Sequence, residues 1–571
     1  MNSLILVIGT GIVYIVAYNT YGKYLGKKIF KLDPEAVCPS RALRDDIDFV
    51  PTQKPILFGH HFTSIAGTGP VVGPAIAIIW GWVPALIWIL LGSIFMGAVH
   101  DFGAMVVSLR NQGRSIGDIA SDIINKRVRT LFLLIIFFEL WIVVAIFGVI
   151  IAIVFTMFPN AVLPVWLEIP IAIWLGYMVY NRGFDHLLLS IIAVVLMYIT
   201  VVIGAYVPIK MPHVLGLDPV SCWVILLLVY AYIASTLPVQ TLLQPRDYIN
   251  SHQLFIALAL LFLGLIFARP DMVAPAVNLS PEGAPPIWPM LFVVVACGAI
   301  SGFHALVSSG TSSKQCDVET SSLTIGYGGM LLEGMLATCV IVACGAGIAL
   351  GLTSGDQTLT GIAAFNEHYA SWGAASGLGS KINAFVIGSA NMIERIGIPH
   401  QVTLTIMGVF VASFAATTLD TATRLQRYIV SELAIAWGTP AAAKRHPATI
   451  IAVGTALVLA FYNGNGQGAL TLWPLFGSIN QLLAGLALLV VTIYLARRNS
   501  PISYTLIPMV FMLIMTTWAM LINLNEYLTT SNWPLFSIGL AVFILEIWMI
   551  IESGVVLKKH YGTGIDPVRF G

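Results

Sequence analysis

The scarcity of charged residues limits what this chain can fold into more than any other feature. Of its 571 residues, 28 are Lys or Arg and 27 are Asp or Glu, whereas 58% are hydrophobic and the mean hydropathy is +0.89. A soluble domain carries roughly 25% charged residues, so this chain cannot cover a water-facing surface of its size. At roughly 20 apolar residues per span, its hydrophobic content suffices for about fifteen transmembrane helices. We therefore expect one all-α polytopic membrane domain over residues 1–571.

Composition and motifs exclude several classes of function. The formal net charge of +1 leaves no basic face for a nucleic-acid partner. The sequence contains neither a G-x-x-x-x-G-K-[ST] phosphate loop nor an H-E-x-x-H metal motif, and no nucleophile, base and orienting group converge locally. We therefore expect no enzyme activity, no cofactor and no bound metal. The six cysteines form no C-x-x-C pair, which predicts reduced, structural thiols.

Lysines and arginines orient the predicted helices. The apolar segments are 3–19, 60–80, 83–108, 130–157, 162–180, 187–207, 219–237, 252–268, 287–310, 323–351, 399–418, 447–462, 471–495, 501–523 and 532–553. With the N-terminus outside, 24 of the 28 lysines and arginines fall inside and 4 outside, as the positive-inside rule requires. This asymmetry predicts an N-out, C-in topology. The Gly-, Ser- and Ala-rich stretch 352–398 is expected to be external or re-entrant.

Two stretches, 59–74 and 302–314, carry helix-breaking and polar residues at membrane depth. Each contains a histidine six residues before a Gly-Thr pair: His61 before Gly67-Thr68, and His304 before Gly310-Thr311. The stretches run in opposite directions in the predicted topology, which is typical of an inverted repeat. We expect the following parts: an N-terminal helix at 3–19, a first repeat at about 59–268, a second repeat at about 287–523 and a C-terminal helix at 532–553.

These two stretches are the predicted substrate site. Unwound backbone frees N–H groups, and the positive end of each half-helix can hold an anion. The predicted substrate-binding residues are His61, Ser64, Gly67, Thr68, Gly69, His304, Ser308, Ser309, Gly310 and Thr311. The alternative is that the small residues only permit close helix packing.

Ionisable and hydroxyl side chains at membrane depth are candidates for ion coupling, because burying them is costly unless they face a cavity or a partner. The candidates are His60, Glu139, Glu333, Thr417, Thr418 and Asp420. His61 and His304 could also carry a proton, since histidine titrates near neutral pH. The alternatives are a neutral histidine or glutamate that hydrogen-bonds a neighbouring helix and, for Asp420, an i to i+4 ion pair with Arg424.

Two further polar pairs allow a functional and a structural interpretation. His100-Asp101 could form an inner gate or a simple pair at a helix end. Asn480 and Gln481 could line the transport path or bridge two helices.

At these residues the chain resembles the carbon starvation protein family of bacterial transporters, from about residue 10 to about residue 500. The resemblance rests on these motifs: Leu57-Phe58-Gly59-His60-His61-Phe62, Gly67-x-Gly-Pro-x-x-Gly-Pro74, Cys297–Leu306 with Ser308-Ser309-Gly310-Thr311, Leu243–Tyr248, and Trp473–Gly477 with Asn480-Gln481. It implies uptake of peptides or pyruvate across the bacterial cytoplasmic membrane, coupled to an ion gradient. It also implies a distant relation to the amino acid-polyamine-organocation superfamily, which has five-plus-five and seven-plus-seven repeat folds.

The residues and the resemblance together predict a mechanism. The carboxylate of pyruvate or of a peptide would bind at the half-helix N-termini near Gly67-Thr68-Gly69 and Gly310-Thr311, while His61, His304 or Glu333 carries the coupled proton. Rocking of one repeat against the other would expose the site to each side in turn. Sodium is the alternative coupling ion, and a channel, a passive facilitator or a transporter-like sensor are the alternative functions. The oligomeric state is left open.

Overall fold

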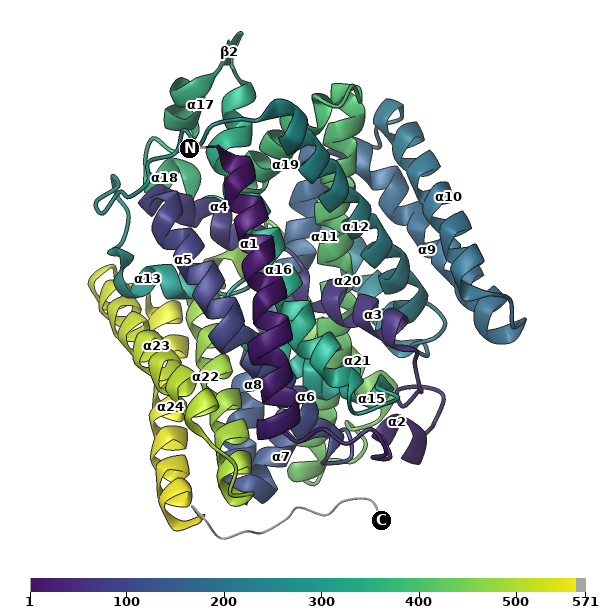
Figure 1. The fold of residues 1–571 in the computed structure, drawn as a ribbon, viewed down its shortest axis with the longest axis vertical. Coiled ribbons are helices and arrows are strands. Elements are labelled where there is room, and N and C mark those ends of the chain that lie inside the picture. The colour runs from purple at the N-terminus through teal and green to yellow at the C-terminus, as the bar shows by residue number, and fades with distance from the viewer. Residues whose placement is uncertain (1, 561–571) are drawn as a thin grey trace.

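The structure is a computed structural model and describes residues 2–560. Six side chains within helices are not described: Lys126, His186, Ser553, Leu557, Lys559 and His560. In the described range, twelve helices are long and apolar enough to cross a membrane, or up to thirteen with one bent pair counted as a single span. The expected all-α polytopic membrane fold is therefore confirmed. Figure 1 shows the helices as one bundle, with α1 starting at the end that carries β2 and α17.

The first half of the chain supplies these helices: α1 (Ser3–Ala17), α2 (Pro39–Ala42), α3 (Lys54–Ala66), α4 (Gly69–Ala77), α5 (Trp82–Gly92), α6 (Ala98–Leu109), α7 (Ile116–Ile123), α8 (Lys126–Met157), α9 (Val162–Gly176), α10 (His186–Tyr206), α11 (Pro219–Thr236) and α12 (Leu243–Ala268). Several begin at residues that suit a helix start. Asn125, Asp185 and Asp218 each accept hydrogen bonds from the first-turn N–H groups of α8, α10 and α11.

The second half supplies the remaining elements: α13 (Ile287–Val294), α14 (Gly302–Val307), α15 (Ser313–Gln315), α16 (Gly329–Val342), β1 (Leu352–Ser354), β2 (Gln357–Leu359), α17 (Gly361–His368), α18 (Trp372–Ala375), α19 (Leu378–Glu394), α20 (His400–Ala436), α21 (Arg445–Phe461), α22 (Trp473–Arg497), α23 (Ser503–Thr529) and α24 (Trp533–His560). Short π- and 3-10-helical turns occupy Tyr18–Gly22, Leu25–Ile29, Ile78–Trp80, Ser93–Gly97, Pro159–Ala161, Tyr177–Asn181, Ser308–Ser312, Leu323–Gly328, Ala343–Gly347, Ile348–Leu350 and Gly468–Leu472.

The predicted count of fifteen spans exceeds the twelve that qualify by length and composition. Three predicted spans account for the difference. The segment 60–80 is the bent pair α3 and α4, at 44° to each other, and the segment 447–462 is the shorter helix α21. The segment 287–310 is divided between α13 and α14, because the backbone unwinds between them.

Burial separates central helices from peripheral ones. In the most apolar 18-residue window of each span, all of α22 and 94% of α20 are buried, against 28% of α24. The helices α8 and α20 pack along each other, and α22 packs against α8 and α14. The broken segments therefore lie against the most enclosed part of the bundle. Helices α9 and α10 form one edge of it (Figure 1).

The stretch 352–398 folds as the hairpin β1–β2 followed by α17, α18 and the buried helix α19. A side chain at Gly379, near the start of α19, would lie 3.2 Å from Met157 at the end of α8. Near its other end, the carbonyl of Met392 lies against Gly264, close to the end of α12. Because Met157 and Gly264 both precede loops predicted to be external, this arrangement fits an external or re-entrant segment better than a span.

Three arginines, on two helices, are placed differently from the topology predicted from sequence. The span expected at 399–418 continues to Ala436 in α20, so Arg424 and Arg427 lie inside a buried helix and not in a loop. Similarly, α12 begins at Leu243, nine residues before the predicted span, and it contains the buried Arg246. The apolar pattern missed these helix extensions because each is stabilised by polar partners on neighbouring helices.

Candidate functional site

The first helix break lies between α3 and α4. Gly67 adopts φ +41° and ψ −137°, a conformation that side chains strongly disfavour. A Cβ atom there would also lie 2.5 Å from the Thr418 hydroxyl on α20 and 3.2 Å from the Phe147 ring on α8. Pro70 follows in the first turn of α4, where its missing N–H costs nothing. Glycine and proline therefore fix the break that the sequence predicts.

The second break covers residues 295–301, between α13 and α14, and it touches the first. A Cβ atom on Gly69 would lie 2.3 Å from the Cys297 sulfur, and one on Gly298 would lie 3.8 Å from the Cα of Pro70. Two unwound segments about 230 residues apart in the chain thus meet in the bundle.

The second break does not lie at Gly310-Thr311, where the similarity to Gly67-Thr68 predicts it. Gly310 and Thr311 lie in the π-helical turn Ser308–Ser312, which continues directly from α14. The prediction of a half-helix N-terminus at Gly310-Thr311 is therefore wrong. The N-terminus of α14 follows Ser301. His61 therefore lies before the first break in the chain, whereas His304 lies after the second break.

Asn480 of α22 caps this N-terminus. Its Oδ1 atom accepts hydrogen bonds from the Phe303 N–H at 2.9 Å and from the Ser301 hydroxyl at 3.1 Å. Gln481 donates to the Phe292 carbonyl in α13 at 2.7 Å. Of the two interpretations of this amide pair, the structure supports the bridging one, because both amides bind backbone groups on either side of the break.

A cluster of buried ionisable groups, here termed the His304 cluster, lies beside the second break. His304 Nδ1 lies 3.1 Å from Asp101 Oδ2, and His304 Nε2 lies 3.3 Å from Glu333 Oε2. His100 Nδ1 contacts the other oxygen of Asp101 at 2.7 Å. All four side chains have no exposed surface. Asp101 is therefore not part of a simple helix-end pair, because it joins α6 to α14.

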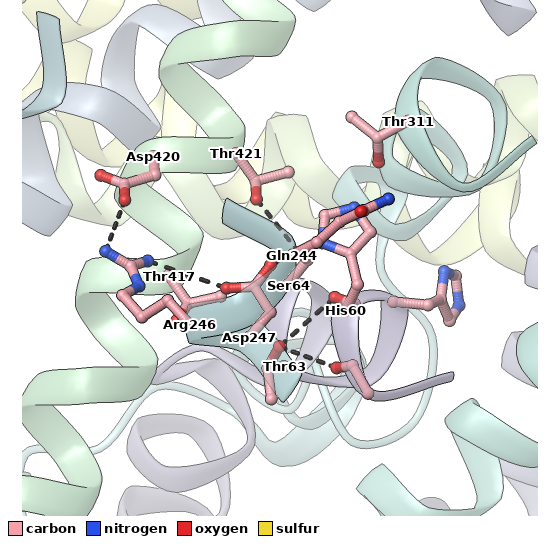
Figure 2. A network of polar contacts seen from close by, with 12 residues as sticks. His60, Thr63, Ser64, Gln244, Arg246, Asp247, Thr311, Thr417, Asp420 and Thr421 are labelled. Atoms are coloured by element: carbon pink, nitrogen blue, oxygen red, sulfur yellow. Dashed lines mark hydrogen bonds and ion pairs between the residues drawn. The ribbon is translucent and has the colours of Figure 1, made fainter. Parts of the chain in front are cut away.

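A second cluster, the Arg246 cluster, lies beside the first break (Figure 2). Arg246 of α12 pairs with Asp420 of α20 at 2.5 Å, and its guanidinium lies 3.8 Å from both Glu168 and Asp247. His60 Nδ1 contacts the second oxygen of Asp247 at 2.5 Å. Four helices, α3, α9, α12 and α20, thus contribute charged groups to one buried set.

Hydroxyl groups link the first break to α20. Ser64 and Thr421 hydrogen-bond at 3.1 Å, as Figure 2 shows, and Thr418 donates to the Ser64 carbonyl at 3.2 Å. One turn away, Asn250 donates to the Thr417 hydroxyl at 3.0 Å. These contacts hold the unwound end of α3 against the middle of α20.

Comparison with known proteins identifies the family. The sequence profile of the carbon starvation protein CstA matches residues 2–519. The chain belongs to the carbon starvation protein family. The peptide transporter CstA of Escherichia coli K12 is 33% identical, over 100% of this chain and 87% of the relative. The pyruvate/proton symporter BtsT of the same strain is 32% identical, over 91% and 81%.

A third relative agrees in class with these two. The peptide transporter CstA of Campylobacter jejuni is 32% identical, over 92% of this chain and 81% of the relative. Among solved structures, an Eremococcus coleocola manganese transporter mutant is similar, with a TM-score of 0.47 and 11% identity over 90% of this chain and 99% of that one. This last likeness is too weak to support an argument. Family membership and the spans together establish a multi-pass membrane protein of a bacterial transporter family, as the sequence predicted.

Several predicted site residues of this carbon starvation family member make local contacts away from both clusters. Ser309 accepts the Ile116 N–H at 3.1 Å, and Thr311 donates to the Val307 carbonyl within its own helix at 3.0 Å. His61 contacts the Ser312 hydroxyl at 2.8 Å, which joins α3 to the π-helical turn. Ser308 and Glu139 are buried and make no hydrogen bond within the described residues.

The i to i+4 pair expected between Asp420 and Arg424 is not formed. Asp420 pairs instead with Arg246, while Arg424 binds Asp48 at 2.9 Å and the Leu237 carbonyl at 2.6 Å. Both residues are fully or almost fully buried, so partners from other parts of the chain, Arg246 on α12 and Asp48 in the loop before α3, replace the weak pair that a surface helix would form.

Two carboxylates of the Arg246 cluster, Glu168 and Asp247, are not among the site residues predicted from sequence. Glu168 lies within the predicted span 162–180, and its charge in an apolar segment was a usable signal. Asp247 was placed in a loop together with Arg246, so nothing marked it as buried.

One group of side chains could hold a metal ion by geometry. Donor atoms of Cys297, His304 and Glu333 lie within 4.8 Å of one another. Both His304 nitrogens, however, already face carboxylates, and ion pairing accounts for the arrangement without a metal.

Proposed function

We propose that this carbon starvation family member is a secondary active transporter that imports peptides or a small carboxylate such as pyruvate, driven by a coupled ion. The observation that carries the proposal is the contact between two unwound segments at Gly69 and Cys297, with ionisable groups buried on either side. Broken helices that meet at a repeat interface are typical of substrate sites in secondary transporters. The names of the E. coli relatives, a peptide transporter and a pyruvate/proton symporter, support both substrate classes.

The His304 cluster supports a proton as the coupling ion. Histidine and carboxylate side chains exchange protons with each other at hydrogen-bond distance, and here His304 lies between Asp101 and Glu333. Fully buried charges are retained at membrane depth mainly where they serve ion or proton movement. The sodium alternative would use the hydroxyls of Thr417 and Thr418 with carbonyls freed at the first break.

Alternating access requires a barrier that can open on each side. One barrier is formed by Asp48, which binds Arg424 at 2.9 Å and Arg427 at 3.5 Å and so fastens the loop before α3 to α20. The excess of basic residues on this side predicts that it faces the cytoplasm. We propose that this contact opens when one repeat rocks against the other to release substrate inward.

Uptake into proteoliposomes tests the proposal. Labelled pyruvate and labelled dialanine are offered separately under an imposed proton gradient, an imposed sodium gradient or no gradient. A secondary transporter accumulates substrate above the outside concentration with one gradient only, and a protonophore abolishes accumulation driven by protons. A channel or facilitator equilibrates without accumulating, and a sensor binds without counterflow. Either of these results would refute the proposed symport.

A further inference from the structure

We infer that Arg246 anchors the carboxylate group of the transported substrate and that Asp420, its present counter-ion, takes up a proton when this carboxylate arrives. This inference rests on the proposed function and specifies the substrate class of its site. The anion-binding group is then the side chain of Arg246 and not a half-helix end, because Asn480 already occupies the N-terminus of α14.

The guanidinium of Arg246 has unused donors. Its NH1 group contacts Asp420 and the Tyr230 hydroxyl, whereas Nε and NH2 make no hydrogen bond within the described residues, although the side chain is 3% exposed. The adjacent Nε and NH2 groups form the edge that binds a carboxylate through two parallel hydrogen bonds. Leaving buried donors unpaired is costly, so this edge is poised for an acceptor.

Arg246 also lines a pocket. Its polar lining groups are Glu168, Tyr230 and Arg246, and Trp166 and Leu227 are among its apolar walls. Small-ligand sites combine apolar walls with a few polar groups in this way. An oxo-acid or a short peptide would place its carboxylate at Arg246 and its apolar part against Trp166.

Charge balance links the arrival of such a carboxylate to protons. The groups facing Arg246 are Glu168 from α9, Tyr230 from α11, Asp247 beside it in α12 and Asp420 from α20, and His60 from α3 faces Asp247. Three carboxylates already surround one guanidinium and one imidazole. A fourth carboxylate is favourable only if a resident one takes up a proton from water, because like charges in a buried site resist joint ionisation. Asp420, which shares Arg246 with the arriving carboxylate, is the proposed acceptor.

Protonation of Asp420 would also reach the helix break. Asp420 lies in the same stretch of α20 as Thr418 and Thr421, which bind the Ser64 carbonyl and the Ser64 hydroxyl beside Gly67. Neutralising Asp420 weakens its ion pair with Arg246, which joins α12 to α20 next to these contacts. Substrate binding would thus loosen α20 at the point where α3 unwinds.

Binding by the purified full-length protein tests the inference. The probes are pyruvate and dialanine, each compared with its uncharged amide, and the readout is the shift in thermal unfolding with ligand concentration. Wild type should bind both acids and neither amide. Arg246→Lys keeps the charge but loses the two parallel N–H donors of the guanidinium, so its affinity for the acids should fall roughly tenfold or more. Arg182→Lys, at an exposed arginine, should bind as wild type does.

Two further variants separate ligand binding from folding. Asp420→Asn should retain binding of the acids but lose its pH dependence, because the side chain at position 420 can no longer take up a proton. The exchange Arg246→Asp with Asp420→Arg restores an ion pair; it should fold, as judged by gel filtration and unfolding temperature, yet not bind the acids. Binding of the acids by this exchanged variant, or equal binding of acids and amides by wild type, would overturn the inference.

The inference and the proposed function fail in different ways. Gradient-driven accumulation that persists unchanged in Arg246→Lys would overturn the inference alone. Binding of the acids that depends on Arg246, without accumulation under either gradient, would refute symport and leave the anchor in place. Failure of wild type to bind either acid would overturn the inference directly.

Discussion

The Nε2 atom of His304 lies 3.3 Å from a carboxylate oxygen of Glu333, and neither side chain has any exposed surface. The two residues come from α14, which begins directly after the second helix break, and from α16. A buried charge is tolerated when a partner of opposite charge faces it. Removing one member therefore changes the charge of the site and not only its packing.

The first prediction concerns proton coupling at Glu333. Glu333→Gln keeps the size of the side chain but cannot exchange a proton, so proton-driven accumulation should fall by about 5- to 150-fold, the usual range of coupling between two ligand sites. Substrate counterflow, which needs no net proton movement, should persist. Both are measured in the same proteoliposomes. Glu394→Gln is the matched control, because Glu394 is about half exposed and pairs with His400. Unchanged accumulation in Glu333→Gln would exclude this pair from coupling.

The second prediction concerns Gly67. Gly67→Ala places a Cβ atom 2.5 Å from the Thr418 hydroxyl and in a backbone conformation that alanine disfavours. Such strain costs roughly 1–3 kcal/mol, so the variant should unfold at a lower temperature and transport more slowly. Thr418→Ala in the same chain should recover part of the loss by removing the clash but not the backbone strain. Gly9→Ala meets nothing within 4 Å and should match wild type. A fully stable Gly67→Ala would mean that α3 and α4 are not held in this bend.

The third prediction concerns the cap of α14. Asn480→Ala removes the acceptor of the Phe303 N–H, which costs about 1 kcal/mol at a helix N-terminus. Asn480→Asp keeps that acceptor and should lower the unfolding temperature less than alanine does. Equal effects of alanine and aspartate would show that the hydrogen bond to Phe303 contributes nothing to stability.

The fourth prediction concerns pH and the loop before α3. Burial tends to raise the pKa of Asp48, but Arg424, Arg427 and Lys314 outweigh it and lower the pKa to about 2. The unfolded chain, with a pKa of about 3.9, binds more protons in this interval. The stabilisation by Asp48 is therefore complete above roughly pH 4 and lost as the pH falls toward 2.

Thermal unfolding of wild type and Asp48→Asn across this pH range tests the direction in which the stabilisation by Asp48 changes with pH. Wild type should be the more stable protein near neutral pH, and the difference should shrink as the pH falls below roughly 4. A difference that stays constant down to pH 2 would show that Asp48 is not held in its charged form by the arginines.

The helices of this protein could be predicted from sequence where each span is uniformly apolar. For α8 and α10 the predicted and observed bounds agree within four residues, because a run of apolar residues can be satisfied only by a lipid-facing or buried helix. Prediction failed at α20 and α12. Their polar extensions contain Arg424 and Arg246, which read as loop residues until their partners Asp48 and Asp420 are placed beside them.

The candidate site shows the same limit. Gly67, Pro70 and the neighbouring histidines indicate an interrupted helix, because clustered glycine and proline residues disrupt a regular helix. The match between His61 and His304, however, misplaced the second break, since Gly310 and Thr311 fit within a helical turn. Local residue types indicate that a segment can unwind, but the contacts with α22 and α4 decide where it does.

The sequence by itself determined that this chain is a multi-pass helical membrane protein of the carbon starvation family, because too few charges exist for a soluble surface and the family motifs are local in the chain. The tertiary structure alone decided which charges meet. Asp420 could have paired with Arg424 on its own helix, but α12 brings Arg246 to within 2.5 Å of it. The physical reason is that an ion pair in a low-dielectric interior depends on distances between helices, and the packing of those helices sets these distances.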